Sequence, residues 1–436
     1  ARSDHSICLP VAGAMADQAG EPAQAAGGDA PPPLQRWLAL AAPLLLLQTA
    51  LVTSSVVLLP ALPLALLPLP PARRAFLAVA SACQTIWFGM ATLLLRAFLG
   101  VRIVIHTNGK DNVHSLLSMD AKSSPRDLLI VSNHRTRLDW MFLWGLAAAI
   151  GRLGGLKIVL KDSLRKAPGF GWATQCFAFP FMSRRDREGD LKTLRSACAL
   201  HGGRASLAML LFPEGTDLSE SNLQKGREHA EKLGLPVYTQ VLHPRTAGFL
   251  AVWDELSRVA EAAASPPPML VDATLAYVDH TPGERPDEKS VFLRGRPCRE
   301  VHVLIEEVKD PPGGPQAEAS TAELCQCLFA AKEERLKRFY APCSSGAAPD
   351  VEALAAGHRH ALFDIPRVAT STLLGAGSVA AIELAAAAFA WHVGVWRAGA
   401  AFLCCCITFA GAGAATGGID RLLLNGAGSG EELKRD

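Results

Sequence analysis

A histidine and an aspartate five residues apart have the types and the spacing of a catalytic base and the carboxylate that orients it. His134 and Asp139 lie within DLLIVSNHRTRLDWMFLWGL at 127–146. Residues five apart on a regular helix do not share a face, so we expect His134 in a turn and Asp139 in the first turn of the helix that follows. Asp139 would then hold one ring nitrogen and leave the other free to take a proton from a hydroxyl group. The alternative is an ordinary turn histidine.

The flanking apolar runs predict the two elements that position this pair. Leu128 to Val131 is short and rich in branched residues, as buried strands are, and Leu138 to Leu146 is long and bulky enough for a buried helix. A strand-to-helix junction holds a polar group at an open edge of a rigid scaffold. No serine or cysteine beside the pair is an obvious nucleophile, although Ser132 is close in sequence. We therefore favour a base that activates the substrate's own hydroxyl over a covalent intermediate.

Two motifs resemble signatures of the glycerolipid acyltransferases, the 1-acylglycerol-3-phosphate acyltransferase family. NHRTRLD at 133–139 has the form Asn-His, four residues, Asp, which is similar to the first signature. LLFPEGT at 210–216 is similar to the family's Phe-Pro-Glu-Gly-Thr signature. Longer runs, among them PGFGWATQ, LLFPEGTDLSESN and KEERLKRFY, resemble the lysocardiolipin acyltransferase branch, and the resemblance covers roughly residues 40–425. It implies catalytic roles for His134 and Asp139.

The resemblance also implies an arginine that binds the acceptor's phosphate. FMSR at 181–184 is similar to the family's second signature, which ends in an arginine after a Phe-rich strand. The planar guanidinium fork suits a phospholipid headgroup. We choose Arg184 over Arg185 for this role. The alternative is that RRDRE, from 184 to 188, is a solvated run of charges.

The predicted buried strand at 205–212 is followed by residues that we expect to bind substrate. They are Glu214, Gly215 and Thr216. A strand end followed by glycine is a place where backbone amides can face a ligand. Glu214 would bind headgroup hydroxyls or hold a nearby arginine in place, and both roles require it to lie close to Arg184.

A fourth motif contains two further candidates for substrate binding. VLHPRTAGF at 241–249 resembles a Pro-containing turn that is associated in the family with binding of the acyl donor. His243 and Arg245 belong to this motif. The alternative is a turn with a purely structural role.

Composition indicates a membrane protein. Of the 436 residues, 50% are hydrophobic and only 19% are charged, and the mean hydropathy is +0.20. This combination is typical of chains with membrane segments. The net charge of +2 is too small to argue for nucleic acid as a partner. Eleven cysteines without paired CxxC spacing predict no zinc site.

Four apolar stretches are candidates for membrane segments. Trp37 to Leu69 and Ala75 to Leu95 carry no charge and reach the ~20 residues that span a bilayer. Val368 to Trp396 is apolar except for Glu383 and His392, and Ala398 to Ile419 is uncharged. The last two stretches fit either two spans or a re-entrant hairpin. Gly413 and Gly417 form a GxxxG pattern, which favours close helix packing, and Cys404 to Cys406 are expected to face the membrane or to pack.

Alternating helical and strand-like patterns predict a mixed α/β acyltransferase domain flanked by transmembrane helices at both ends. Further strands are expected at 101–108, around 157–160, at 269–279 and at 299–308. KEERLKRFY at 332–340 predicts a charged helix with a solvated face, and the histidines of GHRH at 357–360 lack evident partners for a metal.

The predicted segments are a disordered tail at 1–33, N-terminal membrane segments at 34–100, the acyltransferase domain at 101–308, a linker and charged helix at 309–365, C-terminal membrane segments at 366–421 and a tail at 422–436. The Ala-, Gly- and Pro-rich first segment lacks the features of a cleavable signal peptide.

The resemblance implies a multi-pass enzyme of the endoplasmic reticulum membrane that moves a fatty acyl group from acyl-CoA to the free hydroxyl of a lysophospholipid. Lysocardiolipin, lysophosphatidylglycerol and lysophosphatidylinositol are the acceptors associated with the branch. No metal and no cofactor are expected, because the thioester is already activated. The expected partners are acyl-CoA, the lysophospholipid and the lipid bilayer. Three alternatives stay open: synthesis of phosphatidic acid from 1-acylglycerol-3-phosphate, a lipid hydrolase, and a non-catalytic membrane adaptor.

Overall fold

The computed structural model describes residues 33–107, 125–203, 206–278, 287–312, 317–355, 359–362 and 391–425, with scattered residues between 377 and 388. The predicted disordered tail lies outside the described residues except for Pro33. Much of the apolar stretch that begins at Val368, including Glu383, also lies outside them.

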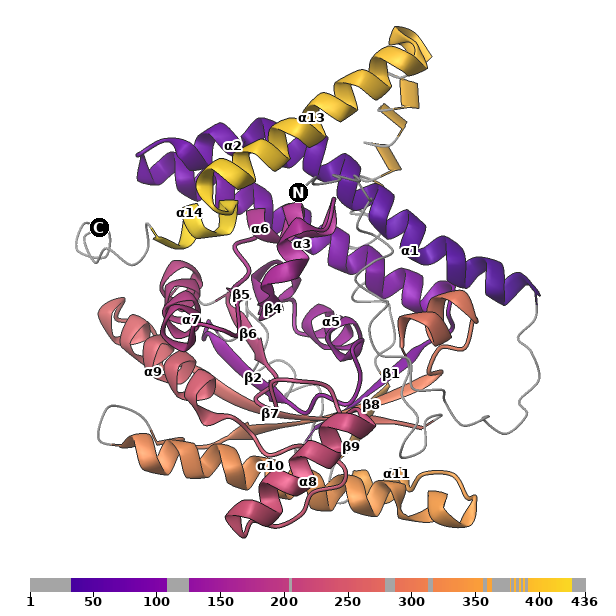
Figure 1. Ribbon diagram of the computed structural model, residues 1–436, viewed down its shortest axis with the longest axis vertical. Coiled ribbons are helices and arrows are strands. Elements are labelled where there is room, and N and C mark those ends of the chain that lie inside the picture. The colour runs from indigo at the N-terminus through magenta and orange to yellow at the C-terminus, as the bar shows by residue number, and fades with distance from the viewer. Residues whose placement is uncertain are drawn as a thin grey trace, which may run out of the picture.

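A seven-stranded mixed sheet forms the centre of the fold (Figure 1). Its order is β3-β6-β2-β7-β8-β1-β9. The four strands from β3 to β7 are parallel, β8 is antiparallel to β7, β1 is parallel to β8, and β9 closes the edge antiparallel to β1. The strands are β1 Arg102–Thr107, β2 Leu128–Ser132, β3 Leu156–Ile158, β6 Ala208–Leu211, β7 Met269–Tyr277, β8 Glu300–Val308 and β9 Arg359–Leu362.

The central strands are apolar because both of their faces are covered. Every residue of β2, β6 and β7 is buried, which is usual for parallel strands that carry helices on both sides. The expected strands are therefore confirmed, with one difference around 157–160. There the chain forms β3 and then β4 (Leu160–Lys161), which pairs with β5 (Phe181–Met182) in a separate two-stranded sheet.

Helices cover both faces of the sheet (Figure 1). On one face, α5 and α6 lie between the sheet and the long apolar helices α1, α3 and α13, while α10 packs on the other face beside α9. The helices are α1 Pro33–Thr53, α2 Leu59–Leu66, α3 Pro70–Ala97, α5 Asp139–Ala149, α6 Phe170–Cys176, α7 Arg187–His201, α8 Glu220–Leu233, α9 Thr246–Ala262, α10 Glu318–Tyr340, α11 Val351–Leu354, α13 Val395–Thr416 and α14 Ile419–Asn425.

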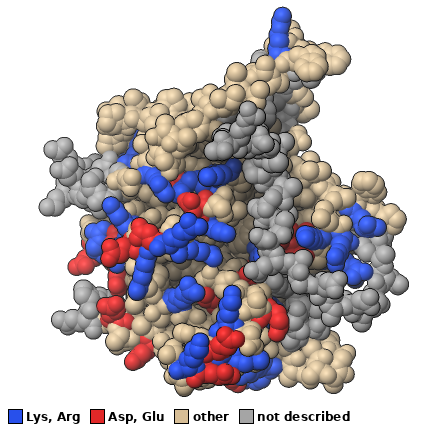
Figure 2. All heavy atoms as spheres, viewed as in Figure 1, with Lys and Arg blue, Asp and Glu red and all other residues tan. Residues whose placement is uncertain are grey.

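Three helical segments in the described part of the chain are long and apolar enough to cross a bilayer. They are Arg36–Leu66, Pro70–Ala97 and Gly399–Thr416. A π-helical turn, Ser54–Leu58, joins α1 and α2 within the first of them. Figure 2 shows few charges over these helices and many over the α/β domain below them.

The prediction that Gly413 and Gly417 form one packing face of a helix is wrong. Gly413 lies within α13, but Gly417 ends that helix with a left-handed φ of +69°. The two glycines therefore do not form one helix face, because the second supplies the backbone conformation that terminates the helix. Of the neighbouring cysteines, Cys404 is exposed and Cys405 is half-buried.

Helix α3 is bound closely to the edge of the sheet. The side-chain amide of Gln84 donates to the carbonyl oxygens of Leu153 (2.6 Å) and Leu156 (2.7 Å). A Cβ atom at Gly154 would lie 2.5 Å from the Ser81 hydroxyl oxygen, so only glycine permits this approach. The apolar helices and the α/β domain thus share one packed interface.

Candidate active site

His134 and Asp139 form the pair that their spacing predicts. His134 lies in the turn after β2, and Asp139 is the first residue of α5. Nδ1 of His134 lies 2.9 Å from Oδ2 of Asp139. Asp139 is fully buried, whereas 19% of the His134 side chain is exposed. The carboxylate is thus shielded from water while the imidazole ring remains accessible.

Asp139 is surrounded by hydrogen-bond donors besides His134. The backbone N–H and the hydroxyl group of Thr136 donate to its two oxygens, each at 2.9 Å. The hydroxyl group of Tyr277, on β7, donates to Oδ1. These donors hold the carboxylate in one orientation, with Oδ2 facing Nδ1 of His134.

Tyr277 is a site residue that was not predicted from the sequence. Its ring is fully buried, and burial together with the neighbouring Asp139 carboxylate raises the pKa of its hydroxyl group well above the ordinary value. The hydroxyl therefore remains a proton donor at neutral pH. The sequence carries no local signal for this contact, because Tyr277 and Asp139 are 138 residues apart.

Asn133, the first residue of the Asn-His signature, has a structural role. Its side-chain oxygen accepts from the backbone N–H of Leu275 at 2.7 Å, and its amide group donates to the Leu275 carbonyl at 3.0 Å. A fully buried amide that satisfies both groups of one backbone residue ties the end of β2 to β7. This contact brings His134 close to the end of β7.

Glu214 contacts the backbone on both sides of the site. The register of β2 and β6 aligns Val131 with Leu211, so His134 and Glu214, each three residues later, emerge next to one another. Oε1 of Glu214 accepts from the His134 backbone N–H at 2.6 Å, and Oε2 accepts from that of Leu242 at 2.8 Å. Glu214 therefore connects three motifs: NHRTRLD at 133–139, LLFPEGT at 210–216, which we call the third motif, and VLHPRTAGF at 241–249.

The hydrogen bonds of Glu214 give it a positioning role. The side chain is only 3% exposed, and backbone amides occupy both oxygens. These two hydrogen bonds are to backbone groups and not to an arginine, so Glu214 positions the backbone of His134. Binding of headgroup hydroxyls by Glu214 stays a prediction. Burial raises the pKa of Glu214 to about 8, although the two backbone N–H donors lower it.

The His134 ring is also supported from the third motif. The ring of Phe212 stacks on it, with the ring centroids 4.4 Å apart. The backbone N–H of Leu218 donates to the carbonyl oxygen of His134 at 2.8 Å. Side-chain and backbone contacts thus fix both the ring plane and the turn, which is the preorganisation that a general base requires.

Gly215 and Arg245 pack against each other. Gly215 has a φ of +75°, and a Cβ atom there would lie 3.4 Å from Cδ of Arg245. The Gly215 backbone N–H donates to the Phe212 carbonyl at 3.0 Å and so closes a turn. Substrate binding by Gly215 stays a prediction. The Arg245 backbone N–H donates to Pro213 at 2.8 Å, and the Arg245 side chain is exposed.

Thr216 and His243 make local contacts. The Thr216 hydroxyl oxygen accepts from the Asn222 side chain at 2.9 Å. The His243 ring stacks on Tyr238 with centroids 4.1 Å apart, and its Nε2 lies 2.9 Å from the carbonyl oxygen of Pro236. These contacts fit the structural-turn alternative for His243, and a role in substrate binding stays a prediction for both residues.

Arg184 projects from a strained turn before α7. Its φ of +62° is left-handed, which is uncommon for a residue other than glycine. The Asp190 carboxylate holds this turn, because it accepts the backbone N–H groups of Ser183 (2.7 Å) and Arg184 (2.8 Å). The Arg184 side chain is exposed. The structure thus links Arg184 to Asp190 and not to Glu214, and phosphate binding stays a prediction.

Helix α10 supports the site from the other face of the sheet. Glu333 accepts the backbone N–H groups of Thr239 (2.7 Å), Gln240 (2.7 Å) and Val241 (3.0 Å). The buried Lys332 ammonium group binds Asp272 on β7. The predicted solvated face is therefore wrong for these two charged residues.

Tyr340, the last residue of α10, reaches the His134 turn. Its hydroxyl oxygen accepts the backbone N–H of Tyr277 at 3.0 Å. The buried guanidinium group of Arg135 lies 4.2 Å from the centroid of the Tyr340 ring, which is a cation–π contact. The helix therefore packs against both the residue after His134 and the tyrosine that binds Asp139.

Among the described residues, no group of three or more His, Cys, Asp or Glu side chains is arranged to hold a metal ion. The chemistry that the described side chains support is general acid–base catalysis. Because Nδ1 of His134 points at Asp139, Nε2 is the ring nitrogen left to accept a proton from a substrate hydroxyl.

Comparison with known proteins agrees with this site. Residues 104–255 match the Acyltransferase family model. Over 286 residues the chain is 37% identical to lysocardiolipin acyltransferase 1 of Danio rerio, a match that covers 64% of this chain and 66% of that protein. It is 35% identical over 265 residues to the Mus musculus protein of the same name, covering 60% and 64%, respectively.

The name of a third relative gives lysophosphatidylinositol, and not lysocardiolipin, as the acceptor. The chain is 33% identical over 225 residues to lysophosphatidylinositol acyltransferase 10 of Caenorhabditis elegans, a match that covers 51% of this chain and 52% of that protein. In all three comparisons the match spans less than two thirds of the relative's length. The chain thus carries an Acyltransferase domain at residues 104–255 and is similar to lysocardiolipin acyltransferases.

Proposed function

We propose that the protein transfers a fatty acyl group from acyl-CoA to the free hydroxyl group of a lysophospholipid. The observation that carries this proposal is the contact between His134 Nδ1 and a buried Asp139 that accepts hydrogen bonds from Thr136 and Tyr277. This arrangement presents one accessible, correctly oriented imidazole nitrogen. No protein nucleophile is required, since the acceptor hydroxyl itself attacks.

The reaction proceeds by direct transfer. His134 Nε2 removes the acceptor's hydroxyl proton as the oxygen attacks the thioester carbonyl, and Asp139 stabilises the imidazolium ion that forms. The new carbon–oxygen bond forms, the carbon–sulfur bond breaks, and the proton passes from His134 to the departing CoA sulfur. Positioning of two bound reactants can lower the barrier by roughly 7–11 kcal/mol, so headgroup contacts matter as much as the base.

The acceptor we propose is an anionic lysophospholipid, with lysocardiolipin first. The names of the relatives support this class, because two name lysocardiolipin and one names lysophosphatidylinositol. The exposed Arg184 supplies a fork of donors for a phosphate group. The second candidate is 1-acylglycerol-3-phosphate, the acceptor named for a relative from Arabidopsis thaliana that is 36% identical over 174 residues.

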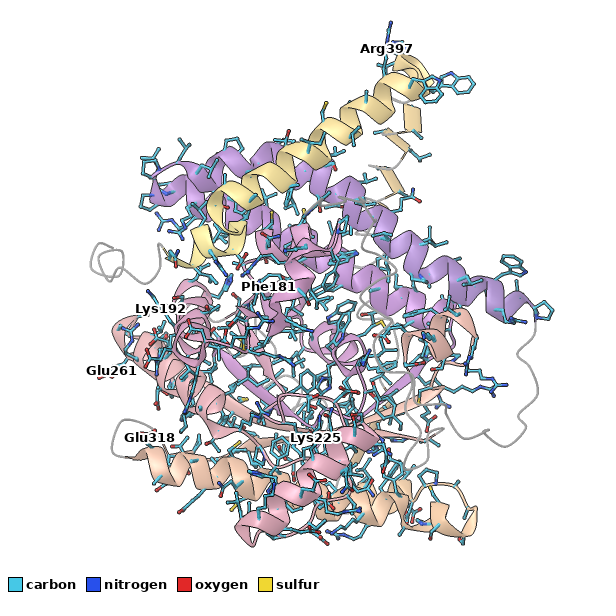
Figure 3. All side chains as sticks on the ribbon, viewed as in Figure 1. Phe181, Lys192, Lys225, Glu261, Glu318 and Arg397 are labelled. Carbon is cyan, nitrogen blue, oxygen red and sulfur yellow. The ribbon has the colours of Figure 1, made fainter. Side chains whose placement is uncertain are left out.

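We further propose that the protein is a multi-pass protein of the endoplasmic reticulum membrane. Three described helices have the length and composition of spans. Trp37 at the start of α1 and Trp396 at the start of α13 are 70% and 92% exposed, and each adjoins an arginine, as is usual at the membrane–water interface. Arg397 lies at the end of α13 that is remote from the α/β domain (Figure 3). Anchoring would deliver both acyl chains from the bilayer without passage through water.

The test is acyl transfer from labelled oleoyl-CoA to a panel of lysophospholipids in microsomes. We expect transfer to lysocardiolipin or another anionic lysolipid, and a loss of about 10²-fold or more in His134→Ala, because the general base is removed. His229→Ala is the matched control, since His229 is exposed on α8. Full activity of a folded His134→Ala would contradict the mechanism. Release of free acid without an acceptor would favour a hydrolase, and no reaction at all would favour an adaptor.

A further inference from the structure

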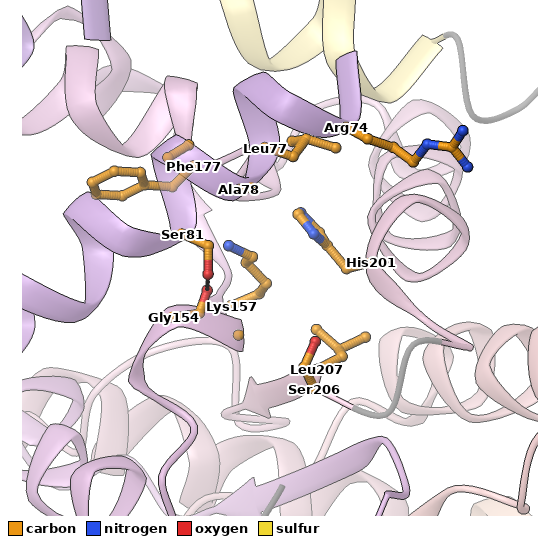
Figure 4. A pocket seen from close by; sticks show the side chains of 12 residues that line it. Arg74, Leu77, Ala78, Ser81, Gly154, Lys157, Phe177, His201, Ser206 and Leu207 are labelled. Carbon is orange, nitrogen blue, oxygen red and sulfur yellow. Dashed lines mark hydrogen bonds between the residues drawn. The ribbon is translucent and has the colours of Figure 1, made fainter. Parts of the chain in front are cut away.

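A cavity of about 180 Å³ lies at the end of the sheet opposite the candidate active site. Ser206 and Leu207, which line it, precede β6, whereas Glu214 follows that strand. Its other walls come from α3, from residues 154–157 and from the end of α7 (Figure 4). The cavity is therefore separate from the His134 site.

Lys157 supplies a buried cation to this cavity. Its side chain is 2% exposed on the edge strand β3. The ammonium group donates to Oε1 of Gln84 at 2.8 Å and lies 5.2 Å from the centroid of the Phe179 ring. No ion pair with a carboxylate of the described residues offsets its burial, and burial lowers its pKa to about 7. An ammonium group has three donors, so further acceptors can bind it.

The remaining lining is basic or small. His201, the last residue of α7, points into the cavity from the side opposite Lys157, while Arg74 of α3 extends from its rim (Figure 4). Ser81 of α3 donates to the carbonyl oxygen of Gly154 at 3.1 Å. The described lining contains three basic side chains and no acidic one. Its charge therefore favours an anion.

The size of the cavity restricts the anion to a small group. Pockets for drug-sized ligands occupy roughly 300–1,000 Å³, so a cavity of about 180 Å³ does not enclose CoA or an acyl chain. A single phosphate group fits these dimensions. The rim belongs to α3, a candidate membrane span that begins four residues before Arg74, so a lipid headgroup can reach the opening as readily as a free ion.

We propose that this cavity binds a phosphate group, held by the Lys157 ammonium group and faced by His201, at the contact between α3 and the edge of the sheet. The anion provides the counter-charge that Lys157 lacks among the described side chains, and charge-assisted hydrogen bonds are about twice as strong as neutral ones. Its binding joins α3 to β3 and so strengthens the attachment of the apolar helices to the α/β domain.

The test follows the unfolding temperature of the purified full chain in dodecyl maltoside micelles. One arm adds inorganic phosphate, with chloride at equal ionic strength as its control. The other adds dioleoylphosphatidic acid, with dioleoylglycerol as its phosphate-free control. We expect at least one phosphate probe to raise the Tm above its control, because a ligand that binds only the folded state stabilises it. A response to the lipid alone identifies a headgroup, and a response to inorganic phosphate identifies the free ion as sufficient.

Two variants show whether the rise in Tm comes from phosphate binding in this cavity. Lys157→Met removes the charge and keeps the stem, and Lys192→Met is the control, because Lys192 lies exposed on the outer side of α7 (Figure 3). We expect the apparent Kd to rise about tenfold or more in K157M, as the loss of one charged donor predicts, and to stay unchanged in K192M. If K157M does not fold, His201→Gln takes its place, and the same rise in apparent Kd is expected. The proposal is overturned if neither probe raises the Tm of the unmutated chain. It is also overturned if the apparent Kd is unchanged in K157M or, where K157M does not fold, in His201→Gln.

Discussion

The hydroxyl group of Tyr277 donates a hydrogen bond to Asp139, although 138 residues separate the two in the chain. They meet because β7 lies beside β2, which leads into the turn before α5. Tyr277 acts on His134 through the Asp139 carboxylate, so it is a positioning residue. Loss of its hydrogen bond should therefore change kcat, which reports on the His134–Asp139 pair, and leave KM unchanged.

Tyr277→Phe should lower kcat about tenfold, the effect of losing one hydrogen bond to a charged group at ~1.4 kcal/mol. KM for acyl-CoA should not change. Steady-state kinetics measure both parameters, and Tyr238→Phe, which keeps its stacking ring against His243, is the control. An unchanged kcat would remove Tyr277 from this role.

Glu214→Gln should reduce the pH dependence of stability. Burial raises the pKa of Glu214 from 4.5 to about 8, so between these values the folded chain binds a proton that the unfolded chain has lost. The resulting stabilisation is complete below about pH 4.5 and is lost as the pH rises through about 8. The measurement is the Tm in detergent at several pH values across this window. Glu228→Gln, on the exposed side of α8, should show the same change of Tm with pH as the unmutated chain. If Glu214→Gln shows that same change of Tm with pH, Glu214 is not the group responsible for it.

Gly215→Ala should lower both stability and activity. Its φ of +75° would cost alanine about 1 kcal/mol, and relaxation of this turn would shift the preceding residue, Glu214, which binds the His134 backbone N–H. Gly234→Ala separates the two effects, because Gly234 has a φ of +64° and no atom lies within 4 Å of the position that a Cβ atom would take there. We expect similar losses of Tm in both variants but a fall in kcat only in Gly215→Ala. Equal kinetics in the two variants would show that the turn at Gly215 does not position Glu214 for catalysis.

Glu333→Ala should destabilise the segment that leads to the fourth motif. Three backbone N–H groups, those of residues 239–241, would lose their acceptor. The two of them that are buried, in Gln240 and Val241, would be left unsatisfied at a cost of roughly 2 kcal/mol or more. Thermal unfolding and limited proteolysis measure the effect. The neighbouring Glu334 is 63% exposed, so Glu334→Ala should behave like the unmutated chain. A Glu333→Ala variant as stable as Glu334→Ala would show that this contact does not hold the segment.

The sequence by itself determined the elements whose signals are local. The buried strands at 128–132, 208–211 and 269–277 could be predicted because strands covered on both faces are nearly continuous apolar runs. The His134–Asp139 contact could be predicted because a single turn joins the two residues. By contrast β9, a four-residue edge strand with arginine and histidine, lacks an apolar pattern and was not expected.

Only the tertiary structure decided the contacts that depend on the order of the strands. Glu214 meets the His134 backbone because β6 pairs with β2, and Tyr277 meets Asp139 because β7 pairs with β2 on its other side. Lys332 and Glu333 look like solvated charges in the sequence, yet the sheet and the 239–241 segment supply buried partners for them. The physical reason is that periodicity reports which side of an element is apolar, whereas the partner of a polar group depends on the neighbour that packing brings to it.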